Sequence, residues 1–353
     1  KKEARKIDRF TQFALVASDQ ALIDAGLNSE NINPDRTGVV FASGIGGLIT
    51  FQNEVIEFAK GDGTPRFNPF FIPKMILDIA AGQISMRHNL RGPNFAVVSA
   101  CASSTNAIIE AYNLLRLGKA DIIVSGGSEA VISQAGVGGF NAMKAMSERN
   151  DDPATASRPY DKDRDGFVMG EASGVLILET LEHALARGAK IYCEIAGGGA
   201  TADAHHITAP HPEGLGAKNV MFAALDDANM KPEDIDYINT HGTSTPLGDI
   251  AEVKAIVSVF GEHAYNLNIS ATKSMTGHCL GAAGVIEAIA CIKSVVHDII
   301  PPTINHFTDD PDLDSRLNFT FNKAQQRTVN AALSNTFGFG GHNACVIVKK
   351  YVA

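Results

Sequence analysis

The chain has 353 residues, with 30 lysines and arginines against 39 aspartates and glutamates, so its formal net charge is −9. An acidic chain of this kind argues against nucleic acid as the main partner. Hydrophobic residues make up 45% and charged residues 20%, a balance that excludes a disordered chain. At about 100 to 200 residues per domain, the length indicates either two core units or one large α/β domain.

The sequence shows no uninterrupted apolar run near the ~18 residues of a membrane helix. Its charged start, residues 1–6, is followed by neither an apolar segment nor a small-residue cleavage site, so a signal peptide is not predicted. Five widely spaced cysteines without a Cys-x-x-Cys pair indicate neither a disulfide framework nor a zinc module. We therefore expect a cytoplasmic protein in a reducing compartment, with no membrane partner.

Strand-like segments rich in β-branched residues alternate with longer segments of helical period, which is typical of an α/β fold with buried sheets. The predicted strands cover residues 37–42, 95–100, 121–126, 175–179, 191–196, 235–240, 267–271 and 343–349. The predicted helices cover residues 102–117, 181–187, 216–228, 250–260 and 281–297. The pattern of residues 95–125 recurs at 267–300, which indicates either two similar halves meeting near Lys190 or ordinary α/β regularity.

Cys101 stands between a predicted strand and a predicted helix of small residues. A thiol at this place faces the positive end of the helix dipole, which favours the reactive thiolate. Cys101 is therefore a candidate nucleophile. Free cysteine is also among the most buried residue types, so an inert core thiol is the alternative.

Two histidines and a lysine follow predicted strands in the second half of the chain. His241 lies in a loop of glycine and hydroxyl residues, and Lys273 and His278 lie just before a predicted helix. The dipole at a helix start disfavours imidazolium, so we expect His278 to be neutral and able to donate a hydrogen bond. A lone histidine is usually a satisfied surface or core residue, but this set in matching loops indicates a site.

Two glycine-rich segments are candidates for main-chain contact with a ligand. Gly-Phe-Gly-Gly at residues 338–341 precedes the last predicted strand, and either an oxyanion-hole N–H or a tight hairpin turn explains it. The turn at residues 44–47 lacks the full Gly-x-Gly-x-x-Gly spacing, so a dinucleotide site is not predicted.

Two further patterns imitate metal sites. Asp161 begins an imitation of a calcium loop, but the twelfth position is Ala172 where a bidentate glutamate is required. The three histidines within residues 205–211 have neither metal-site spacing nor a carboxylate set. We expect neither segment to hold a metal ion.

Nine segments occur in a joint order and spacing of high specificity. They are Ser-Gly-Ile-Gly-Gly (43–47), Asn-Pro-Phe-Phe-Ile-Pro (68–73), Leu-Arg-Gly-Pro (90–93), Ser-Ala-Cys-Ala-Ser (99–103), Ser-Arg-Pro-Tyr-Asp (157–161), Arg-Asp-Gly-Phe-Val (164–168), Thr-His-Gly-Thr-Ser-Thr (240–245), Thr-Lys-Ser-Met-Thr-Gly-His (272–278) and Gly-Phe-Gly-Gly (338–341). Over essentially its whole length the chain resembles the β-ketoacyl-[acyl-carrier-protein] synthases, most closely the type II elongating enzymes of bacterial fatty acid synthesis.

This resemblance implies a thiolase-like α/β fold, with two pseudo-duplicated halves in a layered α-β-α-β-α arrangement, and a homodimer. We expect residues 1–189 to form the half with the nucleophile and residues 190–353 the half with the histidine pair and the lysine. Family members begin some tens of residues earlier with a strand and a glycine turn. The resemblance therefore predicts an N-terminally incomplete chain, with one strand missing from its first half.

The resemblance also implies a decarboxylating condensation without metal or cofactor. Cys101 would take an acyl group from an acyl-carrier thioester, with the backbone N–H groups of Cys101 and Phe339 holding its carbonyl oxygen. After loss of CO2 from malonyl-carrier thioester, neutral His241 and His278 would donate hydrogen bonds to the enolate oxygen. Lys273 would orient His278.

Other matching positions imply supporting and substrate-binding roles. Thr243 and Thr245 match residues that bind the pantetheine arm, Phe339 matches a gate for the second substrate, and Ile45 matches the residue that limits the depth of the acyl pocket. The remaining implied residues are Glu287 and Asp249, as supports, and Thr208 and Phe337, as substrate contacts.

The resemblance further implies docking of an acidic acyl carrier protein on Lys2, Arg5 and Lys6. These residues lie in a short basic segment of an otherwise acidic chain. A charge run is usually a solvated face, but a basic patch also steers an acidic partner.

Several alternatives share parts of this pattern. A type I elongating synthase or a polyketide or aryl-polyene ketosynthase has the same cysteine and histidines. A degradative thiolase needs a second catalytic cysteine where this chain has Phe339, and an initiating type III synthase needs asparagine in place of one histidine. A chain-length factor lacks the nucleophile, whereas Cys101 is present, and a cysteine acyl hydrolase would show no dependence on malonyl groups.

Overall fold

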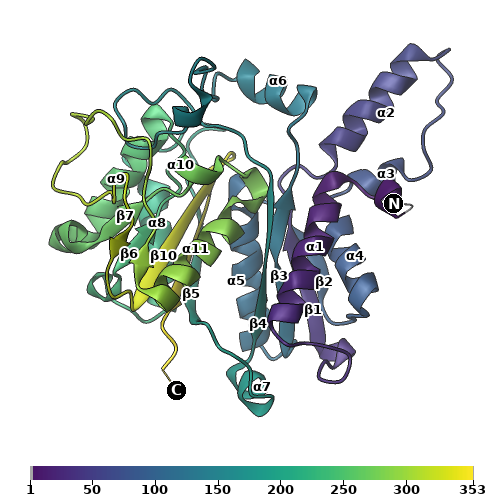
Figure 1. Ribbon diagram of the computed structural model, residues 1–353, viewed down its shortest axis with the longest axis horizontal. Helices are drawn as coiled ribbons and strands as arrows, with labels where there is room; N and C mark the ends of the chain where they lie inside the picture. Colours follow the sequence, from purple (N-terminus) through teal and green to yellow (C-terminus); the bar gives the residue numbers. More distant parts are fainter. Residues whose placement is uncertain (1–2, 353) are drawn as a thin grey trace.

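The computed structural model describes residues 3–352 and contains two mixed β-sheets of related topology (Figure 1). The first sheet has the order β2-β1-β3-β4, and the second runs β7-β6-β10-β11-β5. In both sheets three parallel strands are followed by an antiparallel fourth. The recurrence of the 95–125 pattern at residues 267–300 therefore reflects a duplicated fold.

The strand bounds show where the sheets differ. The first sheet consists of β1 (Thr37–Ala42), β2 (Asn94–Val97), β3 (Ile122–Glu129) and β4 (Ala172–Glu179). The second consists of β5 (Glu194–Ala202), β6 (Tyr237–Asn239), β7 (Asn268–Ser270), β10 (Ala331–Gly338) and β11 (His342–Lys349), and β8 (Ile299–Ile300) pairs with β9 (Gln325–Gln326) separately. Within residues 3–352, β5 pairs with β11 but no strand lies beyond β4. The second sheet is therefore one strand wider.

Helices form three layers around these sheets. The helices are α1 (Arg9–Asp24), α2 (Leu48–Lys60), α3 (Phe71–Met75), α4 (Ile79–His88), α5 (Ser103–Arg116), α6 (Gln134–Ala142), α7 (Leu181–Ala186), α8 (Leu215–Asp227), α9 (Pro246–Phe260), α10 (Lys273–Thr276) and α11 (Ala283–His297). Helices α5 and α11 lie between the sheets and contact both, while α1 and α4 cover the outer face of the first sheet and α8 and α9 that of the second (Figure 1). This is the predicted layered thiolase-like arrangement.

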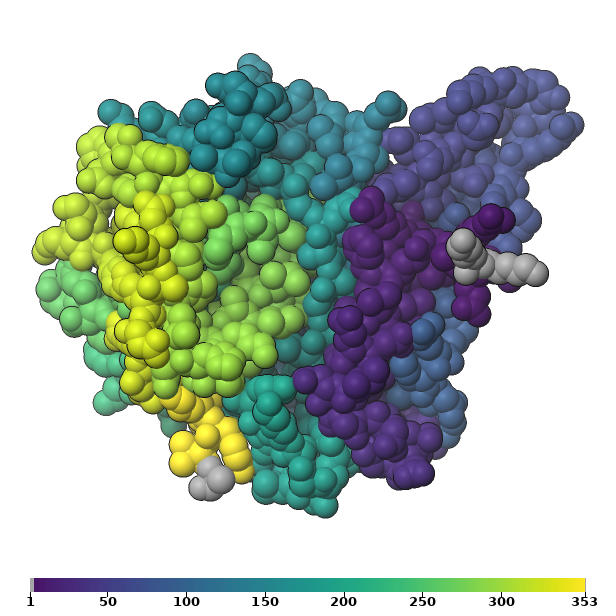
Figure 2. All heavy atoms as spheres, in the orientation of Figure 1, coloured from purple at the N-terminus to yellow at the C-terminus, as the bar shows by residue number. Residues whose placement is uncertain are grey.

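The two central helices approach each other closely because their first turns are built from small residues. A Cβ atom on Gly284 would stand 2.0 Å from the Thr105 hydroxyl oxygen, so only glycine fits there. The segments just before α5 and α11 are thereby brought together at the centre of the molecule. Helix α2, in contrast, projects from the body of the first half (Figure 2).

The sequence prediction overlooked one window. Residues Leu280–His297, which include α11, are long and apolar enough to cross a membrane by length and composition, although 67% of the window is buried inside the fold. Glu287 and Lys293 interrupt the apolar run, which is why it was missed. The position of α11 between two sheets explains its composition, because a helix covered on both sides is apolar all round.

Strand β10 was also not predicted, since its small and polar residues lack a β-branched run. Its first six residues are nevertheless buried, because it lies in the middle of the second sheet. The predicted strand at residues 95–100 ends early, at Val97, and is followed by a 3₁₀ turn.

We propose that the boundary between the two halves lies between residues 189 and 190. This position falls between α7, the last helix of the first half, and β5, the first strand of the second half.

Candidate active site

Cys101 lies in the 3₁₀ turn η3 (Ala100–Ala102), which joins β2 to α5. The preceding residue, Ala100, has a φ of 51°, a left-handed conformation that is uncommon for a residue with a Cβ atom. The matching turn η7 (Leu280–Ala282) before α11 has the same feature, with φ of 48° at Leu280. The two turns contact each other, so Cys101 faces the loop that carries His278.

The thiol of Cys101 lies within hydrogen-bonding distance of His278. The distance from Cys101 Sγ to His278 Nε2 is 3.1 Å, and the two residues are only 8% and 3% exposed. Burial raises the pKa of the Cys101 thiol to about 12, although the Lys273 charge and the Phe339 backbone N–H oppose this. The expectation that the helix dipole would favour the thiolate is therefore wrong, because desolvation outweighs it. The resting thiol is protonated and has one imidazole in reach as a base.

His278 is neutral, as predicted, but the main cause is different. Burial, with a further contribution from Lys273, holds the pKa of His278 well below its usual value. The residue stands just ahead of η7 and α11, as the sequence indicated. Desolvation of the charged form, rather than the helix dipole, keeps its ring uncharged.

His241 is also neutral, and its tautomer follows from its neighbour. Lys273 Nζ lies 3.4 Å from His241 Nδ1, and because an ammonium group only donates, Nδ1 must accept. The single ring proton of His241 is then on Nε2. Burial and the Lys273 charge hold the pKa of His241 well below its usual value. The two rings are perpendicular, with centroids 5.2 Å apart, so the site presents two uncharged imidazoles side by side.

The prediction that Lys273 orients His278 is wrong in its partner. Its ammonium group reaches His241, not His278, and forms an ion pair with Glu287 on α11. Lys273 and Glu287 are 1% and 2% exposed. Burial raises the pKa of Glu287 to about 7 against the opposing charge of Lys273. The pair thus links a catalytic loop to the central helix.

The sequence interpretation missed Glu252 on α9. Its carboxylate accepts hydrogen bonds from the backbone N–H groups of His241 and Gly242, both at 2.9 Å. Burial raises the pKa of Glu252 to about 7. A sequence signal that could have identified Glu252 is its spacing, three residues after Asp249 on a helix that directly follows the His241 loop.

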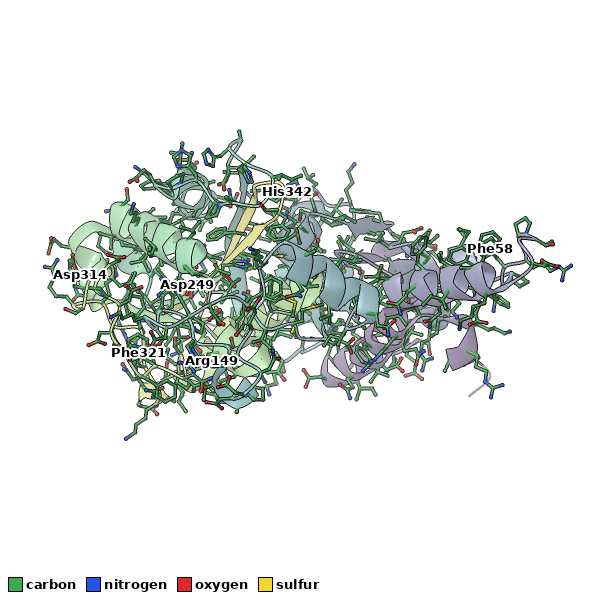
Figure 3. The ribbon with its side chains drawn as sticks, turned by 90° about the horizontal axis from the view of Figure 1, so that it is seen from above. Phe58, Arg149, Asp249, Asp314, Phe321 and His342 are labelled. Atoms are coloured by element: carbon green, nitrogen blue, oxygen red, sulfur yellow. The ribbon has the colours of Figure 1, made fainter. Side chains whose placement is uncertain are left out.

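Asp249 lies on the same helix and binds the segment around residues 160–164. Its carboxylate accepts from the backbone N–H of Tyr160 at 3.0 Å and lies 3.4 Å from the guanidinium of Arg164. Burial raises its pKa to about 6. Figure 3 shows Asp249 inside the second half, far from Phe58 at the other end of the molecule. Asp249 therefore joins α9 to the segment that carries Tyr160 and Arg164.

A cavity of about 430 Å³ opens beside the cysteine and both histidines. The predicted substrate-binding residues that line it are Thr208, Thr243, Thr245, Phe337 and Phe339. The Thr243 and Thr245 hydroxyl oxygens are 3.0 Å apart, and the Phe337 ring centroid is 5.5 Å from that of His241. The hairpin turn between β10 and β11 carries Phe339, so the segment is both a tight turn and part of the wall.

The remaining predicted positions do not line this cavity. Ile45 is not on its wall but packs in the apolar cluster that contains Cys101. Arg5 and Lys6 form an exposed 3₁₀ turn at the start of the described chain, with Lys6 Nζ 5.6 Å from the Phe70 ring centroid. Lys2 lies outside the described residues.

The apparent calcium loop has a structural role. One carboxylate oxygen of Asp161 accepts hydrogen bonds from the backbone N–H groups of Phe307 and Thr308, at 2.7 and 2.8 Å. These bonds join the loop to a distant segment of the second half. Among residues 3–352, no group of three or more histidine, cysteine, aspartate or glutamate side chains is placed to hold a metal ion.

This combination of a duplicated fold and a Cys-His-His site has a known counterpart. The N-terminal domain of the β-ketoacyl synthases matches residues 1–184, and the C-terminal domain of the same family matches residues 192–307. The chain therefore belongs to the β-ketoacyl synthase family, whose members are condensing acyltransferases.

Similar proteins narrow the assignment. The chain is 51% identical over 353 residues to 3-oxoacyl-[acyl-carrier-protein] synthase 2 of Staphylococcus aureus (strain N315). The matched region covers 100% of this chain and 84% of that protein. It is 49% identical over 352 residues to the enzyme of the same name from Synechocystis, covering 99% of this chain and 84% of that protein. The chain is a condensing enzyme of the fatty acid elongation type.

Solved structures agree in fold. A β-ketoacyl synthase from Burkholderia phymatum STM815 has a TM-score of 0.91 at 34% identity, covering 100% of this chain and 85% of that one. A ketosynthase in complex with its type II polyketide acyl-carrier protein has a TM-score of 0.93 at 33% identity, covering 98% and 85%.

Proposed function

We propose that this enzyme transfers an acyl group from acyl carrier protein to Cys101 and condenses it with malonyl-carrier thioester. The products are 3-oxoacyl-carrier thioester, CO2 and free carrier. The observation that carries the proposal is the buried thiol 3.1 Å from one neutral imidazole, with a second imidazole beside it. Chemistry of this kind needs hydrogen-bond donors for a negative oxygen, and two neutral imidazoles can provide them.

In the first step, Cys101 attacks the acyl thioester carbonyl. The thiol proton passes to His278 Nε2 and from there to the departing carrier thiolate, so the step is balanced without an external base. The backbone N–H groups of Cys101 and Phe339 hold the carbonyl oxygen. The proximity of the Phe339 N–H to the sulfur supports this assignment.

In the second step, the bond between the malonyl methylene carbon and its carboxylate breaks. Its electrons pass through the new enolate to the thioester carbonyl oxygen as CO2 leaves. His241, which carries its proton on Nε2, donates a hydrogen bond to that oxygen, and His278 donates a second in the tautomer that carries its proton on Nε2. The enolate carbon then attacks the acyl-enzyme carbonyl, the thioester bond to Cys101 breaks, and the departing thiolate takes the Nε2 proton of His278, which a solvent proton replaces. Because both imidazoles are held neutral before substrate arrives, the donors are preorganised for the transition state.

Mass spectrometry of enzyme and product tests the proposal. With acyl-carrier substrate alone, the wild type should gain one acyl group on Cys101, and added malonyl-carrier should convert it to a 3-oxoacyl product two carbons longer. Cys101→Ala should do neither while keeping its circular dichroism spectrum. Free acid released without malonyl-carrier would instead identify a cysteine hydrolase, and carbon–carbon product from Cys101→Ala would contradict the assignment.

The carrier is proposed to dock on Lys2, Arg5 and Lys6. The exposure of Arg5 and Lys6 in a largely acidic molecule supports this, since a local basic patch attracts an acidic partner. Reversing the three residues to glutamate should raise KM for carrier-linked substrate but not for a pantetheine thioester. Equal effects on the two substrates would contradict docking.

A cytoplasmic homodimer completes the proposal. The bacterial relatives support the location. Strand β2 forms an edge of its sheet, and the exposed side chains of Phe95 and Val98 give this edge an apolar surface, which supports self-association. Phe95→Asp should shift the mass measured by light scattering from two chains towards one; an unchanged dimer would place the interface elsewhere.

A further inference from the structure

Glu129 is a buried carboxylate that neither the sequence interpretation nor the proposed reaction uses. It ends β3 and is 0% exposed. Within residues 3–352 it forms no salt bridge. A buried carboxylate without a cation is costly unless several donors replace its water.

Those donors come mainly from the glycine-rich turn after β1. The backbone N–H groups of Gly44, Ile45 and Gly46 donate to Glu129 at 2.7, 3.2 and 3.3 Å, and the Ser43 hydroxyl donates at 2.9 Å. Successive main-chain N–H groups around one anion form a nest. Glu129 therefore accepts hydrogen bonds from backbone N–H groups of the turn that have few other acceptors.

A further donor comes from the opposite half of the molecule. The N–H of Gly281, in the turn η7, reaches the same carboxylate at 3.1 Å. A Cβ atom on Gly281 would stand 2.2 Å from the Gly44 nitrogen, so the two backbones are in direct contact. One side chain thus joins the two halves at the point where they meet.

The groups anchored by Glu129 surround the nucleophile. The turn that it holds carries Ile45, which packs in the apolar cluster of Cys101. Gly281 lies three residues beyond His278. The Ala100 carbonyl, directly before Cys101, is 3.3 Å from where a Gly44 Cβ atom would stand. A shift of this carboxylate would move the Ile45 turn and the Gly281 turn relative to Cys101.

We propose that Glu129 is a positioning residue that sets the acyl-binding side of the site, by holding the Ile45 turn and the His278 segment against Cys101. Because Glu129 binds the Gly44 N–H and the Gly44 backbone lies against the Ala100 carbonyl, the carboxylate is close to Cys101, and its negative charge is one contribution to the raised pKa of that thiol. The acyl-selectivity part of the inference rests on the proposed function, whereas the effect on the thiol does not.

The test compares Glu129→Gln with wild type in two assays. The variant keeps the size of the side chain but removes its charge and turns an amide N–H towards backbone donors. The ratio of kcat/KM for a long acyl-carrier substrate to that for a short one should change by about fivefold or more, since the Ile45 turn loses a charged anchor. The rate constant for alkylation of Cys101 by iodoacetamide at a fixed pH should rise by about fivefold.

Glu179→Gln is the matched control. This carboxylate lies on the adjacent strand β4, is 9% exposed, and pairs with Arg187 far along the sheet from Cys101. It should leave both readouts within about twofold of wild type. Equal changes in the control, or an unchanged selectivity ratio and alkylation rate in folded Glu129→Gln, would overturn the proposal.

A second variant covers failure of Glu129→Gln to fold. Ser43→Ala removes one donor to the carboxylate and leaves its charge in place, so it should change the selectivity ratio by about threefold, which is less than the effect of Glu129→Gln but more than the control allows. An unchanged ratio would overturn the proposal. If no condensation occurs in any variant, the alkylation assay still reports on Glu129, because it needs no carrier substrate.

Discussion

Replacing Lys273 with methionine should destabilise the enzyme strongly, because it leaves Glu287 buried without its cation. Methionine fills a similar volume, so the perturbation is mainly the loss of charge. Both residues are almost completely inaccessible, at 1% and 2% exposed. Removing one partner of such a pair costs about 3–5 kcal/mol, because the remaining charge keeps its desolvation penalty.

The double variant Lys273→Met, Glu287→Leu should recover most of this loss. Replacing a buried ion pair by apolar groups of similar volume is often nearly neutral, so we expect the double variant within about 1–2 kcal/mol of wild type. Condensation should stay impaired in both variants, because His241 Nδ1 loses its donor. Stability and activity are thereby separated.

The effect of pH on the single variant has a defined sign. Burial raises the pKa of Glu287 to about 7 even beside Lys273, and removing the cation raises it further. The folded carboxyl then keeps a proton that the unfolded one releases above about 4.5. Folding takes up a proton in this range, so the stability of the variant falls as the pH rises and is lowest above the folded pKa.

Urea unfolding followed by circular dichroism, at about pH 5.5 and pH 8 and one protein concentration, measures these differences. The single variant should unfold at the lowest urea concentration, and its gap to the double variant should widen at the higher pH. A single variant as stable as the double variant at pH 8, or one whose stability rises with pH, would refute the reasoning.

Three further predictions concern the reacting groups. His278→Ala should slow malonyl decarboxylation in single-turnover assays more than it slows acylation of Cys101, and equal losses would contradict its role as an enolate donor. Because the pKa of the Cys101 thiol is raised to about 12, its alkylation by iodoacetamide should keep accelerating from about pH 7 to pH 10; a plateau below about pH 9 would contradict a buried protonated thiol. Glu252→Gln should lower kcat about tenfold with little change in KM, since it loosens the backbone under His241, and a change confined to KM would assign it to substrate binding instead.

Much of the fold could be predicted from local pattern. Buried strands such as β1 and β3 have β-branched runs, and the helices next to them have small residues, so alternation alone indicated layers. Strand β10 escaped prediction because its burial depends on both neighbours in the sheet. The apolar character of the window around α11 was also underestimated. Two charged residues interrupt its apolar run, although the helix is covered by a sheet on both sides.

The nature of the reacting groups was determined by the sequence itself. Cys101, His241, Lys273 and His278 occur in motifs whose order and spacing specify the family, and glycines mark the turns where backbones touch. Residue type and spacing are local properties, and they carry over to any correct fold.

Only the tertiary structure decided how these groups act on one another. Burial, not the helix dipole, sets the protonation of Cys101, and Lys273 contacts His241 rather than His278. Glu129 binds backbone N–H groups of two segments distant in the chain, for which no motif exists. Desolvation and contact between remote segments arise only when the two halves pack together, so a linear pattern does not contain them.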